Sequence, residues 1–312
     1  MKTIEYPITT NYISHWGLWE AAREVLQNAM DADDWSQRYT NHTMVVTNEG
    51  NLDPSAFLLG TTTKGANDRG QYGEGLKLAL LVLARLCRQP VVTVPGTTYR
   101  ASIAYSSAFN AEVLVLEIDD DLNESDCVEV SFHCTEEEYD DIDTKICGEE
   151  YGIVGNEGNI YVGSLFVCNM DLKYSYNLKP NDLMLGRDRN IPNLFDIQYC
   201  VGKYLSGEQV IDVALEERSD LSGHNTPEKE VAEAWVERYP DVVPVGMDEQ
   251  HIIKADKTKV VPSWLARAIR SVVNFVYSKP KTPLEKLKEW RDSVDLDDEE
   301  LEKLDTIIGE LE

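Results

Sequence analysis

Three polar side chains recur at helical spacing in the run from residue 24 to residue 32, Glu-Val-Leu-Gln-Asn-Ala-Met-Asp-Ala. Offsets of four and three place Glu24, Asn28 and Asp31 on one face of a helix. An Asn oxygen can ligate a hard cation, and a nearby carboxylate can orient or deprotonate a water molecule. The stripe therefore suits a site for a magnesium-bound triphosphate, although a solvated helix face would carry the same residue types.

Glycines cluster in a second segment, Gly70-Gln71-Tyr72-Gly73-Glu74-Gly75, directly before the apolar run from Leu76 to Ala84. Glycines let the backbone approach a ligand closely, and the first turn of a following helix offers N–H groups to an anion. The order is not that of a dinucleotide-binding loop. It is not a P-loop either, because Lys77 falls one place late and no Ser or Thr follows it. The segment predicts a phosphate cradle, with a simple tight turn as the alternative.

With the turn Asn48-Glu49-Gly50 between them, the two motifs resemble those of the GHKL ATPase superfamily. The motifs are most similar to those of its ninety-kilodalton heat-shock chaperone branch. That branch has the motif E-L-I-S-N-A-S-D-A where this chain has Glu24 to Ala32, and the motif G-Q-F-G-V-G-F where this chain has Gly70 to Leu76. The resemblance covers roughly residues 15 to 135. It implies the Bergerat ATP-binding fold, a two-layer α/β sandwich on a mixed, mostly antiparallel sheet, with ATP and Mg²⁺ as ligands.

The resemblance also implies a role for each matching residue. Glu24 corresponds to the general base that orients the attacking water, with Glu20, one turn earlier on the same face, as a rival. Asn28 corresponds to the magnesium ligand. Further nucleotide contacts are implied at Asp31, Asn48, Gly50, Thr62, Lys64, Gly70, Gly73 and Gly75.

A later run, Leu183 to Asn190, resembles the transducer segment of the same branch, in which an Arg reaches the γ-phosphate. The match implies Arg189 for that role, with Arg187 as the second choice. An Arg fork suits a terminal phosphate that bears extra charge. A structural turn of paired Arg and Asp would explain the same run.

The adenine-reading box departs from the family pattern D-x-G-x-G. Asn48 stands in place of the Asp, and Leu52 replaces the second glycine. An Asn side chain both accepts and donates hydrogen bonds, so base selectivity is less sharply defined. The position of the family's Thr on a later strand falls at Asp126 or Cys127.

Hydrophobic patterning predicts a helix over residues 17–39 and a strand at Met44–Thr47, then strands at 91–94, 99–106, 113–118 and 128–134. One further strand is expected over residues 160–167. We expect three domains: an ATP-binding domain at 1–150, a smaller α+β transducer-like domain at 151–225, and a small α/β segment with C-terminal amphipathic helices at 226–312.

Charge and composition limit the functional classes. The 312 residues include 29 basic and 56 acidic side chains, for a net charge of −27. Such a field repels nucleic acid and anionic lipid, so direct binding to either is not expected. No apolar run is long enough for a membrane span, no signal sequence opens the chain, and the six cysteines form no C-x-x-C pair. These features predict a cytoplasmic protein with reduced thiols.

Together the observations predict a Mg²⁺-dependent ATP-binding protein. In this hypothesis it is a slow, chaperone-like ATPase that couples nucleotide state to conformation, or to the binding of a protein partner or a second copy. The alternative is a nucleotide-gated acidic binding module or inhibitor with little turnover, of the kind that a phage or mobile element could encode. A histidine kinase is disfavoured, because no helical hairpin with an acceptor His precedes the ATP-binding segment.

Overall fold

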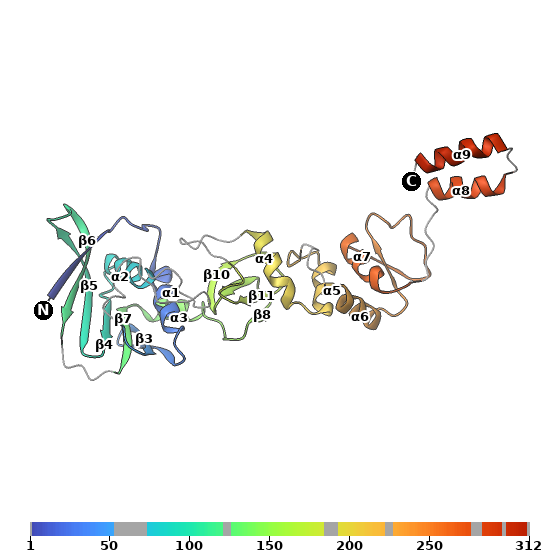
Figure 1. The fold of residues 1–312 in the computed structure, drawn as a ribbon. Coiled ribbons are helices and arrows are strands. Elements are labelled where there is room, and N and C mark those ends of the chain that lie inside the picture. The colour runs from blue at the N-terminus through green and yellow to red at the C-terminus, as the bar shows by residue number, and fades with distance from the viewer. Residues whose placement is uncertain are drawn as a thin grey trace. The chain divides into compact units, whose positions relative to one another are not determined.

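A computed structural model describes residues 2–52, 74–120, 126–183, 193–221, 227–275, 283–294 and 298–310. The chain divides into two compact units, Met1–Val201 and Gly202–Glu312 (Figure 1). The domain boundaries expected near residues 150 and 225 remain predictions. Within the described residues, no helix has the length and apolar character needed to cross a membrane. All six cysteines are free thiols.

The N-terminal unit is built on a seven-stranded sheet in which every neighbouring pair is antiparallel. The strand order is β1-β6-β5-β4-β7-β3-β2. Helices α1 (Leu18–Ala29) and α2 (Gly75–Arg85) pack on each other and on strands of this sheet (Figure 1). The expected α/β class with a large, antiparallel sheet is thus confirmed. The strands are β1 Lys2–Thr9, β2 Trp35–Thr40, β3 Thr43–Glu49, β4 Val91–Val94, β5 Thr97–Ser106, β6 Ala111–Asp119 and β7 Cys127–His133.

The main core lies between the two helices and one face of the sheet. Strand residues alternate between this core and the other face, so Met44 and Val46 of β3 point inward beside Val130 and Phe132 of β7. α1 contributes apolar residues at helical spacing, and in α2 every residue from Lys77 to Leu83 is buried. Full burial of one such Leu or Phe side chain contributes roughly 1.5–3 kcal/mol.

The helix expected over residues 17–39 is wrong in its second half. α1 ends at Ala29, and Trp35–Thr40 forms β2, which pairs along its whole length with β3. Asn41 and His42 connect the two strands with φ of 49° and 60°, the left-handed geometry of a tight hairpin turn. Pairing with β3 therefore overrides the local helical pattern after Ala29.

The single strand expected over residues 160–167 is a hairpin. β9 (Asn159–Val162) and β10 (Leu165–Asn169) are separated by Gly163 and Ser164, whose φ values are 57° and 73°. These strands belong to a four-stranded sheet of order β10-β9-β11-β8, with β8 at Gly152–Gly155 and β11 at Ser175–Leu178. β11 runs parallel to β9, and the other pairs are antiparallel.

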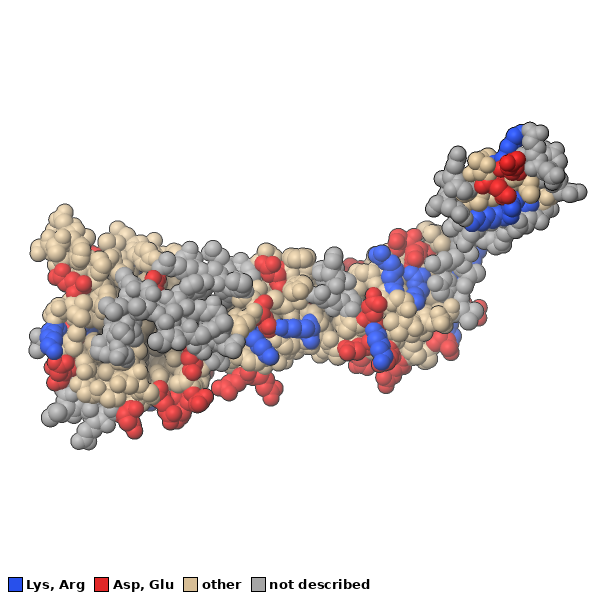
Figure 2. Space-filling view, in the orientation of Figure 1, with Lys and Arg blue, Asp and Glu red and all other residues tan. Residues whose placement is uncertain are grey.

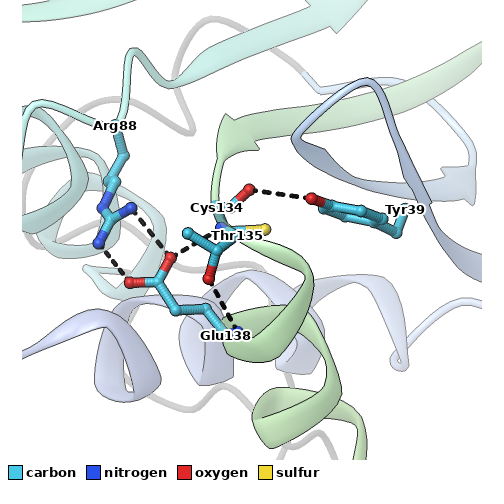
Figure 3. Close-up of polar contacts among 5 residues, drawn as sticks. All are labelled: Tyr39, Arg88, Cys134, Thr135 and Glu138. Carbon is cyan, nitrogen blue, oxygen red and sulfur yellow. Dashed lines mark hydrogen bonds and ion pairs between the residues drawn. The ribbon is translucent and has the colours of Figure 1, made fainter.

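Helix α3 (Glu136–Asp143) occupies the acidic stretch after β7 and is fastened to the end of α2 by a polar clamp (Figure 3). The Arg88 guanidinium donates two hydrogen bonds to the Glu138 carboxylate, at 2.5 and 3.0 Å. Glu138 also accepts from the Thr135 N–H, and the Thr135 hydroxyl accepts from the Glu138 N–H, which makes a capping box. Beside it, the Tyr39 hydroxyl donates to the Cys134 carbonyl at 3.5 Å (Figure 3).

Helix α4 (Leu194–Val201) is the last element of the N-terminal unit. The C-terminal unit begins with a short 3₁₀ turn at Gly202–Tyr204 and contains one pair of parallel strands, β12 (Val243–Gly246) and β13 (Thr258–Val261). Its helices are α5 Gly207–Leu215, α6 Glu228–Arg238, α7 Ser263–Val272, α8 Pro283–Ser293 and α9 Asp298–Glu310.

Candidate functional site

Helix α1 places Glu24 and Asn28 one turn apart on the same face. The Asn28 amide nitrogen donates to the Glu24 backbone carbonyl at 2.7 Å. This bond engages the nitrogen and not the oxygen, which is the atom that a hard cation takes. Asp31 does not share the helical face as expected, because α1 ends at Ala29 and Asp31 lies in the turn that follows.

The rival carboxylate, Glu20, has a different task at the start of α1. Its Oε2 accepts a hydrogen bond from the Gly17 backbone N–H at 2.8 Å, so it caps the first turn of the helix. Glu24 lies one turn further along and is only 5% exposed. The geometry therefore separates a helix-capping carboxylate from a buried one.

Glu24 packs directly against the first residue of α2. A Cβ atom added at Gly75 would overlap Glu24 Oε2 and lie 3.3 Å from its Cδ. A larger residue at this position would force the end of the Glu24 side chain to shift, whereas glycine leaves the carboxylate where it is. The first turn of α2, with its N–H groups and positive dipole end, therefore lies beside a buried carboxylate.

The other oxygen of the same carboxylate faces a buried cation. Arg23 Nη2 is 3.6 Å from Glu24 Oε1, and the two side chains are 8% and 7% exposed. The Arg23 guanidinium also lies over the ring of Trp16, with Cζ 5.8 Å from the ring centroid. The Glu24 carboxylate is thus bounded by Gly75 on one side and by Arg23 on the other.

The residues of the expected adenine box lie at the end of β3. Asn48 pairs with Val128 of β7, and Glu49 pairs with Cys127, so the position expected for the family's Thr is next to Asn48. The Asn48 amide nitrogen donates to the Glu49 carbonyl at 2.9 Å. Gly50 has a φ of 109° and nothing within 4 Å of an added Cβ, so its backbone conformation, not crowding, requires glycine.

Lys77 is a buried charged residue that the sequence reasoning did not select. It lies in the first turn of α2 and is 1% exposed. Burial lowers the pKa of Lys77 below its ordinary value, and the nearby charge of Glu74 opposes that shift. The available signal was that Lys77 is the only charged residue in the apolar run from Leu76 to Ala84.

Five of the selected residues lie outside the described part of the chain: Thr62, Lys64, Gly70, Gly73 and Arg189. The second choice for the γ-phosphate contact, Arg187, lies outside it as well. The described residues contain no cluster of three or more His, Cys, Asp or Glu side chains placed to hold a metal ion. The metal-binding role expected of Asn28 stays a prediction.

Figure 2 shows Asp and Glu spread along one edge of the N-terminal unit, with few Lys or Arg among them. Comparison of the chain with the profiles of known protein families finds no match, and comparison with curated proteins finds none. The functional argument therefore depends on two contacts of Glu24, the close approach of its carboxylate to Gly75 and the hydrogen bond from Asn28 to its backbone carbonyl.

Proposed function

We propose that the chain binds Mg²⁺–ATP beside the first turn of α2 and hydrolyses it slowly, coupling nucleotide state to conformation or partner binding. One observation carries the proposal: the buried Glu24 carboxylate rests on Gly75 at the start of α2, so closely that a Cβ there would overlap Oε2 and force the side chain to shift. A hydrophobic contact between two helices needs neither a carboxylate nor a glycine at this point. A reaction centre next to a phosphate cradle needs both.

Each residue takes a role that fits its chemistry. The N–H groups at the start of α2 bind phosphate oxygens, and the Asn28 oxygen contributes to holding Mg²⁺. The Mg²⁺ ion neutralises charge on the phosphates when it is bound. A water oxygen attacks the terminal phosphorus, Glu24 takes the proton of that water, and the bond to the bridging oxygen breaks to leave ADP and phosphate. The Bergerat fold is part of the same proposal and is supported by the large antiparallel sheet with α1 and α2 packed on it.

The test compares three variants of α1. Asn28→Ala should abolish Mg²⁺-dependent ATP binding, measured by calorimetry with and without chelator. Glu24→Ala should leave ATP binding largely intact and lower single-turnover hydrolysis by roughly 10²–10⁴-fold, the usual contribution of a general base. Glu20→Ala is the matched control: it should cost about 1 kcal/mol of stability through the lost cap and leave turnover unchanged.

Several outcomes contradict this reading. A wild-type chain without magnesium-dependent affinity for ATP rules out the site. If Glu24→Ala hydrolyses ATP normally and Glu20→Ala loses hydrolysis, the general base is Glu20 and not Glu24.

The second candidate function is the nucleotide-gated acidic binding module. Asn48, which stands where the family has Asp, favours this second function. Its amide nitrogen donates to the Glu49 carbonyl, and an Asn side chain selects adenine less strictly than an Asp does. Under that function wild type and Glu24→Ala would bind ATP alike and neither would turn it over.

A further inference from the structure

Residues 10–16, the 10–16 turn, connect β1 to α1 and are held by one side chain from the end of α2. The Arg85 guanidinium donates to four backbone carbonyls of this turn. Nη1 reaches two of them and Nη2 the others, at Thr10 (3.0 Å), Tyr12 (3.3 Å), Ile13 (3.4 Å) and Trp16 (2.7 Å). A planar guanidinium with five donors is suited to such a role, whereas a lysine ammonium is not.

The 10–16 turn needs this support because its backbone is strained. Ile13 has a φ of 45°, and a β-branched residue in that region is a genuine outlier. Such a conformation costs on the order of 1–3 kcal/mol and persists only where its surroundings enforce it. Arg85 and the packing of Ile13 against the core provide that enforcement.

The last residue of the turn leads to the Glu24 carboxylate. Arg85 Nη2 holds the Trp16 carbonyl, and the Trp16 ring, 5% exposed, lies under the Arg23 guanidinium. Arg23 in turn lies 3.6 Å from Glu24 Oε1. Each contact joins a buried or half-buried group to the next, so the conformation of the turn and the position of the carboxylate are connected through packed side chains.

We propose that the 10–16 turn, held by Arg85, is a positioning element for Glu24 that acts through Trp16 and Arg23. The inference rests on the proposed ATPase function, because it assigns the turn a part in that reaction. Gly75 limits the movement of the Glu24 carboxylate on the Oε2 side. The 10–16 turn, acting through Arg23, limits its movement on the Oε1 side. Reactions that depend on a positioned base lose rate steeply when the base moves by a fraction of an ångström.

The test uses Arg85→Gln and Trp16→Leu, with Trp16→Phe as the conservative variant that keeps an aromatic face for Arg23. Arg88→Gln is the matched control, because it removes a comparable clamp from the same unit without touching the turn. Hydrolysis rate, ATP affinity and the ¹³C shift of the Glu24 carboxyl carbon are measured, the last assigned with Glu24→Gln.

Arg85→Gln and Trp16→Leu should lower kcat by about tenfold, change ATP affinity less than about threefold, and move the Glu24 carboxyl shift. Trp16→Phe should recover most of the rate, and Arg88→Gln should leave rate and shift as in wild type. An unchanged Glu24 shift in both Arg85→Gln and Trp16→Leu, or the same loss in Arg88→Gln, overturns the inference. A wild type that binds no ATP refutes the proposed function instead, and the carboxyl shift still decides the positioning role.

Discussion

At the scale of the residue, the contact between Gly75 and Glu24 can be tested by adding one methyl group at Gly75. Gly75→Ala places a Cβ on the Glu24 Oε2 position, so it should lower turnover by about 10- to 100-fold and reduce the melting temperature. Gly148→Ala is the matched control, because nothing lies within 4 Å of a Cβ there. Thermal unfolding and single-turnover hydrolysis of both variants provide the measurement.

A double-mutant cycle sharpens this test. In a Glu24→Ala background the overlapping oxygen is gone, so Gly75→Ala should no longer cost stability. If the two changes are additive, the clash does not arise from the carboxylate and the close approach of α1 and α2 has another cause.

The residue scale also shows what sequence could and could not reveal about the site. The motif wording selected Glu24 and Gly75, which the structure brings into contact, and the spacing placed Asn28 one turn from Glu24. It could not reveal that Arg85 holds the Trp16 carbonyl, because that contact joins two residues separated by a long stretch of chain. The sequence also could not distinguish the roles of Glu20 and Glu24, because both lie on the same helical face and the spacing alone does not show which carboxylate caps the first turn.

At the scale of the element, the clamp between Arg88 and Glu138 fastens α3 to the end of α2 and should depend on pH. Burial alone would raise the pKa of Glu138, but hydrogen bonds from Thr135 and Arg88 outweigh it and hold the pKa below its ordinary value of 4.5. The clamp therefore stabilises the fold above pH 4.5, and this contribution is lost as the pH falls through the lowered value.

Glu138→Gln keeps the shape of the side chain and removes its charge. It should cost about 1 kcal/mol near neutral pH, and the gap to wild type should close below pH 4.5. Urea unfolding at several pH values measures the gap. Glu137→Gln, a change at an exposed neighbour on α3, should show little gap at any pH. A gap for Glu138→Gln that stays constant with pH would mean that the carboxylate charge does not hold the clamp.

Elements also show where local sequence pattern gives way to tertiary pairing. The strands from β3 to β7 were predictable because they are short runs of β-branched and apolar residues, and β7 also alternates between buried and less buried positions. β2 was not, because Trp-Ser-Gln-Arg-Tyr-Thr has weak alternation and follows a helical run, and its partner β3 decides its conformation. The turn at Gly163 and Ser164 was missed although the sequence carries its signal, because two residues of type Gly-Ser between apolar runs are typical of a hairpin loop.

At the scale of the whole molecule, the net charge of −27 opposes compactness. Raising ionic strength from about 0.01 M to about 0.15 M shortens the screening length from about 30 Å to about 8 Å, so the melting temperature should rise. NaCl and KCl should act alike, because screening does not depend on the ion. A fall in melting temperature would show that exposed pairs such as Arg38–Glu129, which salt weakens, outweigh the repulsion.

The position of β1 in the sheet has a consequence for the newly made chain. β1 is made before its partner β6, because Lys2 pairs with Ile118 and Tyr6 with Leu114, and β3 finds its partner β7 only when His133 has been made. At ~5–20 residues per second, the apolar face of α1 and the inward residues of β1 remain uncovered for about 6–25 s. The sheet of the N-terminal unit is therefore completed late in synthesis, after β6 and β7 have been made.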